Sequence, residues 1–174
     1  RPRYAPLLPL EVWECDRDSS PGDLEAWCAG ADFVFNLAGV NRPEDPAEFM
    51  EGNLGFASEL LGLLERCGNA CPVMLASSAQ ASLEGRYAGS EYGKSKLAGE
   101  ELFRDHSERT GAKVLVYRFP NLYGKWCRPN YNSAVATFCH NVARGLPVRV
   151  DDPSTELELL HVDDLVAEML GALL

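Results

Sequence analysis

Apolar runs of strand length alternate with longer amphipathic stretches along most of this chain. The short runs are rich in valine, leucine and phenylalanine, and the longer stretches repeat their apolar residues at helical spacing. The pattern predicts strands at residues 11–16, 32–38, 72–77, 113–119 and 148–150. It predicts helices at residues 21–28, 46–67, 91–110 and 133–144, and a last helix that begins near Asp163. Apolar strands that alternate with helices indicate a parallel sheet covered on both faces.

This order of elements is typical of an α/β fold, a Rossmann-like doubly wound parallel sheet, with its opening part missing. Such a sheet begins with a strand, a glycine-rich turn and a helix. None of the fifteen glycines forms GxGxxG or GxxGxxG after a strand. The chain also begins without methionine and ends within a helix-like run. We therefore expect residues 1–174 to be a truncated Rossmann-like domain that lacks the first strand and the glycine-rich turn.

The composition is that of a soluble globular protein, since 46% of the 174 residues are apolar and 24% are charged. No apolar run approaches the roughly 18 residues that a membrane-spanning helix needs, so no membrane partner is expected. The net charge is −10. This acidic balance argues against nucleic acid as the main partner, because nucleic acid would need a basic surface.

The charge is unevenly distributed along the chain. Seven basic residues and no acidic residue lie between positions 109 and 149. They are Arg109, Lys113, Arg118, Lys125, Arg128, Arg144 and Arg149. A basic segment in an acidic protein predicts a local site for an anionic ligand.

The six cysteines are spread along the chain without a CxxC pair. The chain is too long and too apolar to be a disulfide scaffold, so we expect reduced, mostly buried thiols and a cytoplasmic protein. Cys67 and Cys71, taken with His140 or His161, match no common zinc spacing. No metal site is therefore predicted.

The strongest chemical signal is YGKSK at residues 92–96, which opens the predicted helix at residues 91–110. Tyr92 and Lys96 are four residues apart and therefore share one helix face. A lysine ammonium and the helix N-terminus both favour tyrosinate, so we expect the pKa of Tyr92 to lie below its ordinary value near ~10. Ser78, at the end of the preceding strand, can hydrogen-bond a reacting oxygen. This set suits hydride transfer to or from a carbonyl, with Tyr92 as general acid or base.

Six motifs occur in an order that is also found in a known family. They are NLAG at 36–39, GNLGFASELL at 52–61, SSAQ at 77–80, YGKSK at 92–96, RFPNLYG at 118–124 and HVDDL at 161–165. In this order the chain resembles the extended short-chain dehydrogenase/reductases, the NAD-dependent epimerase/dehydratase family. Residues 36–49 and 123–143 are similar to the capsular polysaccharide biosynthesis reductases of the CapF type. The resemblance covers essentially all of the chain.

The resemblance implies NAD(P)H-dependent reduction of a 4-keto-6-deoxy UDP-N-acetylhexosamine in the synthesis of UDP-N-acetyl-L-fucosamine, a precursor of capsular or surface polysaccharide. It implies a UDP-sugar as partner and a homodimer for the full-length protein. In the CapF type, a zinc-carrying cupin domain follows the reductase domain. We expect residues 1–174 to lack both that domain and the phosphate loop, and therefore to bind the cofactor poorly alone.

The resemblance also implies roles for individual residues. Ser78, Tyr92 and Lys96 match the catalytic positions, and Asn53 matches an asparagine that braces the central strands. The implied cofactor-binding residues are Asp16, Arg17, Leu37, Ala38, Gly39, Lys96 and Pro120. The implied substrate-binding residues are Asn121, Lys125, Arg128, Asn130 and Asn132.

Two of these sets carry chemical detail of their own. An acid at the position of Asp16 favours a free ribose 2′-hydroxyl, whereas Arg17 can hold a 2′-phosphate, so the pair favours NADP(H) over NAD(H) without deciding it. The planar fork of Arg128 can bind a diphosphate in a bidentate way, and Lys125 is a second candidate. His161 resembles a strand-end histidine, and the following Asp163 and Asp164 are expected to cap the last helix.

Two other functions remain open at this point. An NAD-dependent nucleotide-sugar epimerase or dehydratase uses the same three catalytic positions but recycles its cofactor. The dehydratases usually carry an acidic pair directly after the catalytic serine or threonine, where this chain has Ala79 and Gln80. A non-catalytic nucleotide-binding or scaffold domain would explain the missing phosphate loop, but it would not need the set of Ser78, Tyr92 and Lys96.

Overall fold

The computed structural model describes residues 10–16, 18–40, 43, 45 and 47–174. Its centre is a parallel sheet of three strands in the order β1, β2, β3. These strands are β1 (Val34–Asn36), β2 (Val73–Ser78) and β3 (Val114–Phe119). Every residue of β2 is buried, as expected for the middle strand of a covered sheet. The α/β fold class predicted from the alternation is confirmed.

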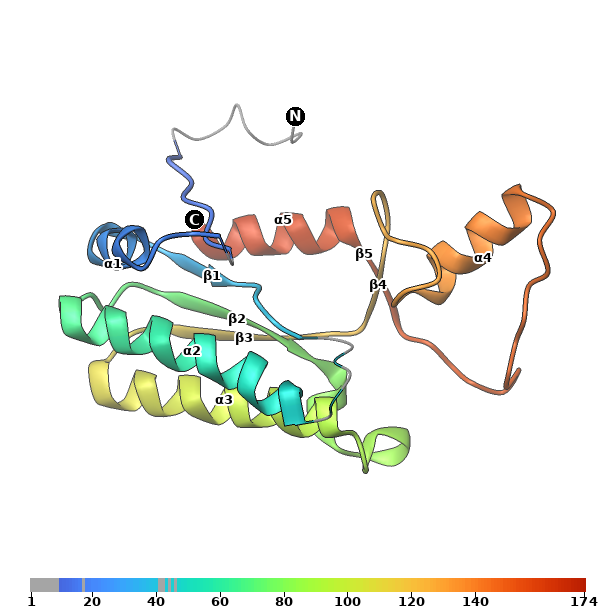
Figure 1. Ribbon diagram of the computed structural model, residues 1–174, viewed down its shortest axis with the longest axis horizontal. Helices are drawn as coiled ribbons and strands as arrows, with labels where there is room; N and C mark the ends of the chain where they lie inside the picture. Colours follow the sequence, from blue (N-terminus) through green and yellow to red (C-terminus); the bar gives the residue numbers. More distant parts are fainter. Residues whose placement is uncertain (1–9, 17, 41–42, 44, 46) are drawn as a thin grey trace.

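Helices cover the sheet from two sides (Figure 1). Helices α2 (Ala47–Cys67) and α3 (Glu91–Thr110) lie together on one side, and α1 (Pro21–Gly30) packs against α2. Helix α5 (Val162–Leu173) lies on the opposite side, as a doubly wound arrangement requires. The core lies between the sheet and the helices α2 and α3, where Leu61, Leu64 and Phe103 are almost completely buried.

A second, smaller sheet follows β3 along the chain. Strand β4 (Asn121–Tyr123) pairs in parallel with β5 (Leu159–His161), and α4 (Ala134–Ala143) lies in the long connection between them. In Figure 1 this pair stands beyond the end of β3, with α4 farther out. Apolar patterning did not reveal these two strands, because three residues are too few to show a period of two.

Two predicted strands are wrong. Residues 11–16 and 148–150 have no strand structure and pair with no strand in the described part of the chain. Their apolar residues are exposed, with Val12 at 70% and Val150 at 56%. A run of strand-like residues forms a strand only beside a partner, and here Trp13 lies against Gly30 at the end of α1 instead.

Helix α3, which carries Tyr92 and Lys96, is capped at both ends, and the caps set its bounds. Ser90 caps its first turn by accepting a hydrogen bond from the Gly93 amide at 2.9 Å. Gly111 ends it in the left-handed conformation, with φ of 74°. The predicted helix at residues 91–110 therefore has the bounds that the structure shows.

Across the described residues, no helix is both long and apolar enough to cross a membrane.

The cysteines are all free thiols, but the expectation that most are buried is wrong. Only Cys28 and Cys71 are buried, whereas Cys15 and Cys139 are exposed. Cys28 belongs to the core cluster between α1 and α2. Burial, with smaller contributions from neighbouring thiols, raises the pKa of Cys28 from 9.0 to about 11.

This environment predicts that Cys28 resists alkylation. Raising a thiol pKa from 9.0 to about 11 lowers its thiolate fraction at neutral pH roughly one hundredfold, and the thiolate is the reactive form. Mass spectrometry after brief iodoacetamide treatment of the native protein should therefore find Cys139 labelled and Cys28 unlabelled. Urea-unfolded protein, in which both thiols react, is the control. Equal labelling in the native protein would contradict the burial of Cys28.

Candidate active site

The predicted catalytic residues meet at the carboxyl end of the central sheet. Ser78 is the last residue of β2, and the first turns of α3 bring Tyr92 and Lys96 to the same edge. All three line one cavity of about 1020 Å³. Clefts at this edge of an open parallel sheet are where α/β proteins bind their ligands.

A close approach between two segments keeps Ser78 near the start of α3. The Ser78 hydroxyl accepts a hydrogen bond from the Gln80 amide at 3.2 Å and so begins the short helix η1 (Ala79–Ser82). The Ser90 hydroxyl donates to the Gln80 side chain at 2.7 Å. A Cβ at Gly93 would collide with the Gln80 carbonyl oxygen, so glycine is required there. These contacts hold the segment that follows Ser78 against the start of α3, which carries Tyr92.

The electrostatics of the tyrosine–lysine pair differ from the prediction. Burial raises the pKa of Tyr92 above its ordinary value, and a hydrogen bond with Ser78 offsets this only in part. Burial lowers the pKa of Lys96. The Lys96 ammonium lies 5.6 Å from the centre of the Tyr92 ring and donates to the Ala76 carbonyl at 3.1 Å. The expected lowering of the Tyr92 pKa is therefore wrong for the protein alone, and the phenol stays protonated at neutral pH.

Asn53 braces the loop that follows β1 against helix α3, whereas the family resemblance implied a brace for the central strands. Its side-chain oxygen accepts from the Val40 amide at 2.9 Å, and its side-chain nitrogen donates to the Ser95 hydroxyl at 2.9 Å. Ser95 in turn donates to the Tyr92 carbonyl at 2.8 Å. The buried Asn53 thus links the loop to the first turn of the catalytic helix.

Part of the predicted cofactor set lines the cavity. Leu37, Gly39, Lys96 and Pro120 do so. A Cβ at Gly39 would lie only 3.0 Å from both the Lys96 ammonium and the Asn53 side-chain oxygen, so a larger residue would press on both side chains. The small, exposed loop beside a buried lysine fits the nicotinamide half of a dinucleotide.

The other predicted cofactor residues are not part of this cavity. Ala38 is exposed beside it, and its amide donates to the Asn36 side chain at 3.2 Å. Asp16 lies in an exposed turn before α1, where its carboxylate accepts from the Asp18 amide. Arg17 lies outside the described residues. The predicted contact of Asp16 and Arg17 with the adenosine ribose stays a prediction.

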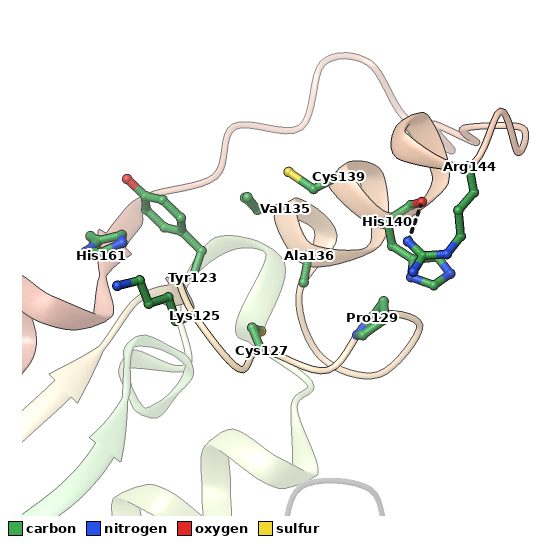
Figure 2. Close-up of a pocket in the computed structure, with 11 residues that line it drawn as sticks. Tyr123, Lys125, Cys127, Pro129, Val135, Ala136, Cys139, His140, Arg144 and His161 are labelled. Carbon is green, nitrogen blue, oxygen red and sulfur yellow. Dashed lines mark hydrogen bonds between the residues drawn. The ribbon is translucent and has the colours of Figure 1, made fainter. Parts of the chain in front are cut away.

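The predicted substrate residues are divided between two places. Asn121 and Asn132 line the large cavity, and the Asn121 side chain donates to the Glu158 carbonyl at 3.2 Å. Lys125 lines a second cavity of about 550 Å³ between the small sheet and α4 (Figure 2). Arg128 and Asn130 line neither cavity. Arg128 lies instead over the Tyr131 ring, 5.6 Å from its centre.

His161 has the structural role that the sequence suggested. Its Nδ1 accepts from the Asp163 amide at 3.2 Å and caps α5, so it takes the place that was predicted for Asp163 and Asp164. Its ring packs edge-on against Tyr123 at 5.1 Å, and Figure 2 shows the two side by side with Lys125. Within the ranges that the structure describes, no three His, Cys, Asp or Glu side chains gather as metal ligands.

The basic segment at residues 109–149 does not form one anion-binding wall. Arg109 pairs with Glu65, Arg118 with Glu100 and Arg149 with Asp151. In Figure 2, Lys125 and Arg144 lie at opposite ends of the second cavity. Absence of acids from one stretch of sequence says nothing about acids elsewhere in the chain that the fold brings to it.

Residues 4–174 match the NAD dependent epimerase/dehydratase family. The chain belongs to this family. It is 45% identical over 157 residues to the UDP-2-acetamido-2,6-beta-L-arabino-hexul-4-ose reductase of Pseudomonas aeruginosa, an alignment that covers 90% of this chain and 41% of that protein. The chain therefore spans less than half the length of this relative.

Solved structures agree with the fold. The crystal structure of the capsular polysaccharide assembling protein CapF from Staphylococcus aureus superposes with a TM-score of 0.80 and 42% identity, over 97% of this chain and 44% of that one. The UDP-glucose 4-epimerase of Thermotoga maritima superposes with a TM-score of 0.75 and 22% identity, over 87% of this chain and 55% of that one. The second likeness concerns the fold alone. The Rossmann-like class predicted from the sequence is confirmed.

Four residues that the sequence analysis did not single out also line the large cavity. Arg86 and Tyr87 belong to the short helix η2 (Gly85–Tyr87), and Glu156 and Glu158 precede β5. The Arg86 guanidinium lies 4.8 Å from the centre of the Tyr87 ring and donates to its hydroxyl at 2.6 Å. No family motif includes these residues, so only their place in the fold connects them with the site.

Proposed function

We propose that this chain belongs to an enzyme that reduces the 4-keto group of a UDP-linked 6-deoxy-N-acetylhexosamine with NAD(P)H. The observation that carries this proposal is the meeting of Ser78, a protonated Tyr92 and the buried Lys96 at one cavity. The reductase named above, which shares 45% of the aligned residues, supports the choice of a keto sugar as substrate.

Each of the three side chains has a distinct task in this reaction. A nicotinamide cofactor held beside Gly39 and Lys96 would supply the hydride for the carbonyl carbon. The Tyr92 hydroxyl donates its proton to the carbonyl oxygen as negative charge develops there. The Ser78 hydroxyl hydrogen-bonds the same oxygen and polarises the carbonyl. Lys96 places its ammonium beside the Tyr92 ring and at the loop of Gly39, where it can bind the nicotinamide ribose.

The protonation state of Tyr92 suits a general acid for ketone reduction. Because burial raises its pKa, the phenol holds its proton below that raised value and loses it only at higher pH. A protonated phenol can act as an acid, which ketone reduction needs, whereas alcohol oxidation needs a base. Ser78 lies at the same cavity and lowers the Tyr92 pKa in part, so both hydroxyls can address one reacting oxygen.

Cofactor consumption tests the proposed reaction. The protein in its full natural length is mixed with the UDP-linked 4-keto sugar and NADPH, and the absorbance of NADPH is followed while the sugar is analysed. We expect one NADPH to be consumed for each 4-keto group reduced. Conversion of the sugar without net loss of NADPH would overturn the reductase in favour of an epimerase, and binding without conversion would favour a non-catalytic domain.

Four finer features follow as proposals. The UDP-N-acetyl-L-fucosamine route derives from the family resemblance. The preference for NADP(H) over NAD(H) derives from Arg17 beside the expected ribose position, and parallel assays with the two cofactors test it. A homodimer is proposed from the family resemblance, and light scattering of the full-length protein tests its mass. A cytoplasmic location is proposed from the free thiols, which suit a reducing compartment.

Arg86 is the side chain that we expect to matter most for substrate affinity. Of the described residues that line the large cavity, Arg86 and Lys96 carry the positive charges, and Lys96 is buried beside Tyr92. A guanidinium hydrogen bond to a phosphate contributes about 1.5–3 kcal/mol, so Arg86→Gln should raise the KM for the UDP-sugar at least about tenfold with little change in kcat. Steady-state kinetics measure both constants.

Two further arginines make this comparison specific. Arg66→Gln, at the exposed end of α2, is the matched control and should leave KM unchanged. Arg128→Gln measures the role that the family resemblance implies for the loop of residues 125–132. The prediction for Arg86 assumes that the diphosphate of the UDP-sugar binds near this side chain. A larger rise in KM for Arg128→Gln than for Arg86→Gln would contradict that assumption.

A further inference from the structure

A buried carboxylate joins the catalytic helix to the two strands beneath it. Glu100 lies on α3, and its side chain is only 5% exposed. One of its oxygens accepts from the Ser77 hydroxyl at 2.5 Å and from Arg118 Nε at 2.8 Å. The other accepts from a terminal guanidinium nitrogen of Arg118 at 2.7 Å. Three donors on two strands thus hold one carboxylate on the helix.

The position of this contact relates it to the reaction. Tyr92, Lys96 and Glu100 follow one another at intervals of four, so they form one stripe of α3 that faces the sheet. Ser77 and Arg118 are direct partners in the pairing of β2 with β3. Ser77 is also the neighbour of Ser78. A displacement of Glu100 would therefore move the Ser78 end of β2 relative to Tyr92.

The charge of Glu100 is well compensated. Burial alone would raise its pKa, but the hydrogen bonds from Arg118 and Ser77 outweigh burial and keep the pKa below its ordinary value. The carboxylate is therefore ionised at neutral pH. An ionised carboxylate with three short hydrogen bonds holds its partners in a defined geometry, because charge-assisted bidentate pairs are directional.

We propose that Ser77, Glu100 and Arg118 form a clamp that positions the Ser78 hydroxyl against the Tyr92 hydroxyl. The proposal rests on the proposed function, and it assigns these three residues as positioning residues. Ser77 also lines the large cavity, but its hydroxyl is bonded to Glu100 and acts on the reaction through Ser78. The clamp fixes the distance between strand and helix at the edge where the proton is transferred. A misplacement of about 1 Å at such a site can lower a rate up to a hundredfold.

A matched control exists at the other end of α3, where a carboxylate of α2 contacts this helix. At the far end of α3, Glu65 on α2 accepts one hydrogen bond from Arg109 at 2.6 Å and lies 3.0 Å from His106 Nδ1. Glu65→Gln therefore removes a carboxylate that also ties α3 to a neighbouring element, but it does so away from the cavity. If Glu100 served only to hold α3 in the fold, Glu65→Gln and Glu100→Gln would affect turnover alike.

Kinetics of the full-length protein test the clamp. Ser77→Ala and Glu100→Gln should each lower kcat about tenfold and leave KM within about twofold, while Glu65→Gln changes neither. In a Ser78→Ala background, adding Ser77→Ala should cost less than about twofold, because the residue that it positions is already absent. An equal loss in both backgrounds, or the same loss for Glu65→Gln, would overturn the proposal. Ser77→Ala removes a single hydroxyl and keeps the test available if Glu100→Gln does not fold.

A second measurement does not depend on the reaction. The Tyr92 phenol is titrated by NMR of ¹³C-labelled tyrosine, with Tyr92→Phe used to assign its signal. Ser77→Ala should raise the Tyr92 pKa further, because the hydrogen bond with Ser78 that lowers it is weakened, and Glu65→Gln should not. An unchanged titration in Ser77→Ala overturns the clamp. A shifted titration in a protein that reduces no keto sugar overturns the proposed function alone.

Discussion

Replacing Tyr92 by phenylalanine should lower kcat for keto-sugar reduction about a hundred- to ten-thousandfold. The substitution removes only the hydroxyl that donates the proton, and a positioned general acid contributes a factor of this size. The ring remains, together with its packing against Phe49 at 5.6 Å and against the Lys96 ammonium. Substrate affinity, measured by calorimetry with the UDP-sugar, should therefore change little.

Tyr117→Phe is the matched control for this experiment. Tyr117 lies on β3, outside the cavity, and its hydroxyl donates to Glu168 at 3.2 Å. Loss of that hydroxyl should leave kcat unchanged. A Tyr92→Phe enzyme with wild-type turnover would show that another group supplies the proton.

Truncation of Leu64 to alanine should lower the free energy of unfolding by about 2–5 kcal/mol, the range for a buried leucine. Leu64 has no exposed surface and lies on α2 in the cluster that joins this helix to α1 and the sheet. Its removal leaves a cavity that the surrounding helices cannot fill without moving. Chemical denaturation followed by circular dichroism measures the change.

Leu146→Ala removes the same atoms from an exposed position. Leu146 follows α4 and is 47% exposed, so its truncation should change the free energy of unfolding far less. Equal losses for the two variants would contradict the location of the core between α2 and the sheet.

In the candidate site, local sequence patterns predicted the positions of the residues but not their pKa values. The spacing of Tyr92 and Lys96 predicted a shared helix face, and Ser78 was expected at a strand end, because helical and strand periods are local properties. The same reasoning failed for the pKa of Tyr92, since it treated Lys96 as a neighbouring charge in water. In the folded protein both groups are buried, and the loss of hydration is the largest effect on each pKa.

The basic segment shows the same limit for ion pairs. Arg118 was counted among the seven basic residues that predicted a site for an anionic ligand, yet Glu100 neutralises it from eighteen residues away in sequence. Conversely, Arg86 attracted no notice as a single cation between two motifs, although it lines the large cavity. The predicted strand at residues 11–16 failed because a strand also needs a partner, which no local pattern supplies.

By itself, the sequence determined the alternation of strands and helices, the family, and the three residues that the proposed chemistry requires. These depend on periodicity and on motifs within short segments, where neighbours in sequence are also neighbours in space. Tertiary structure alone decided which cations face the cavity, that Tyr92 keeps its proton, and that Glu100 joins helix α3 to strands β2 and β3. Those outcomes depend on burial and on charge pairs between distant segments, because hydration and Coulomb energy are set by three-dimensional surroundings.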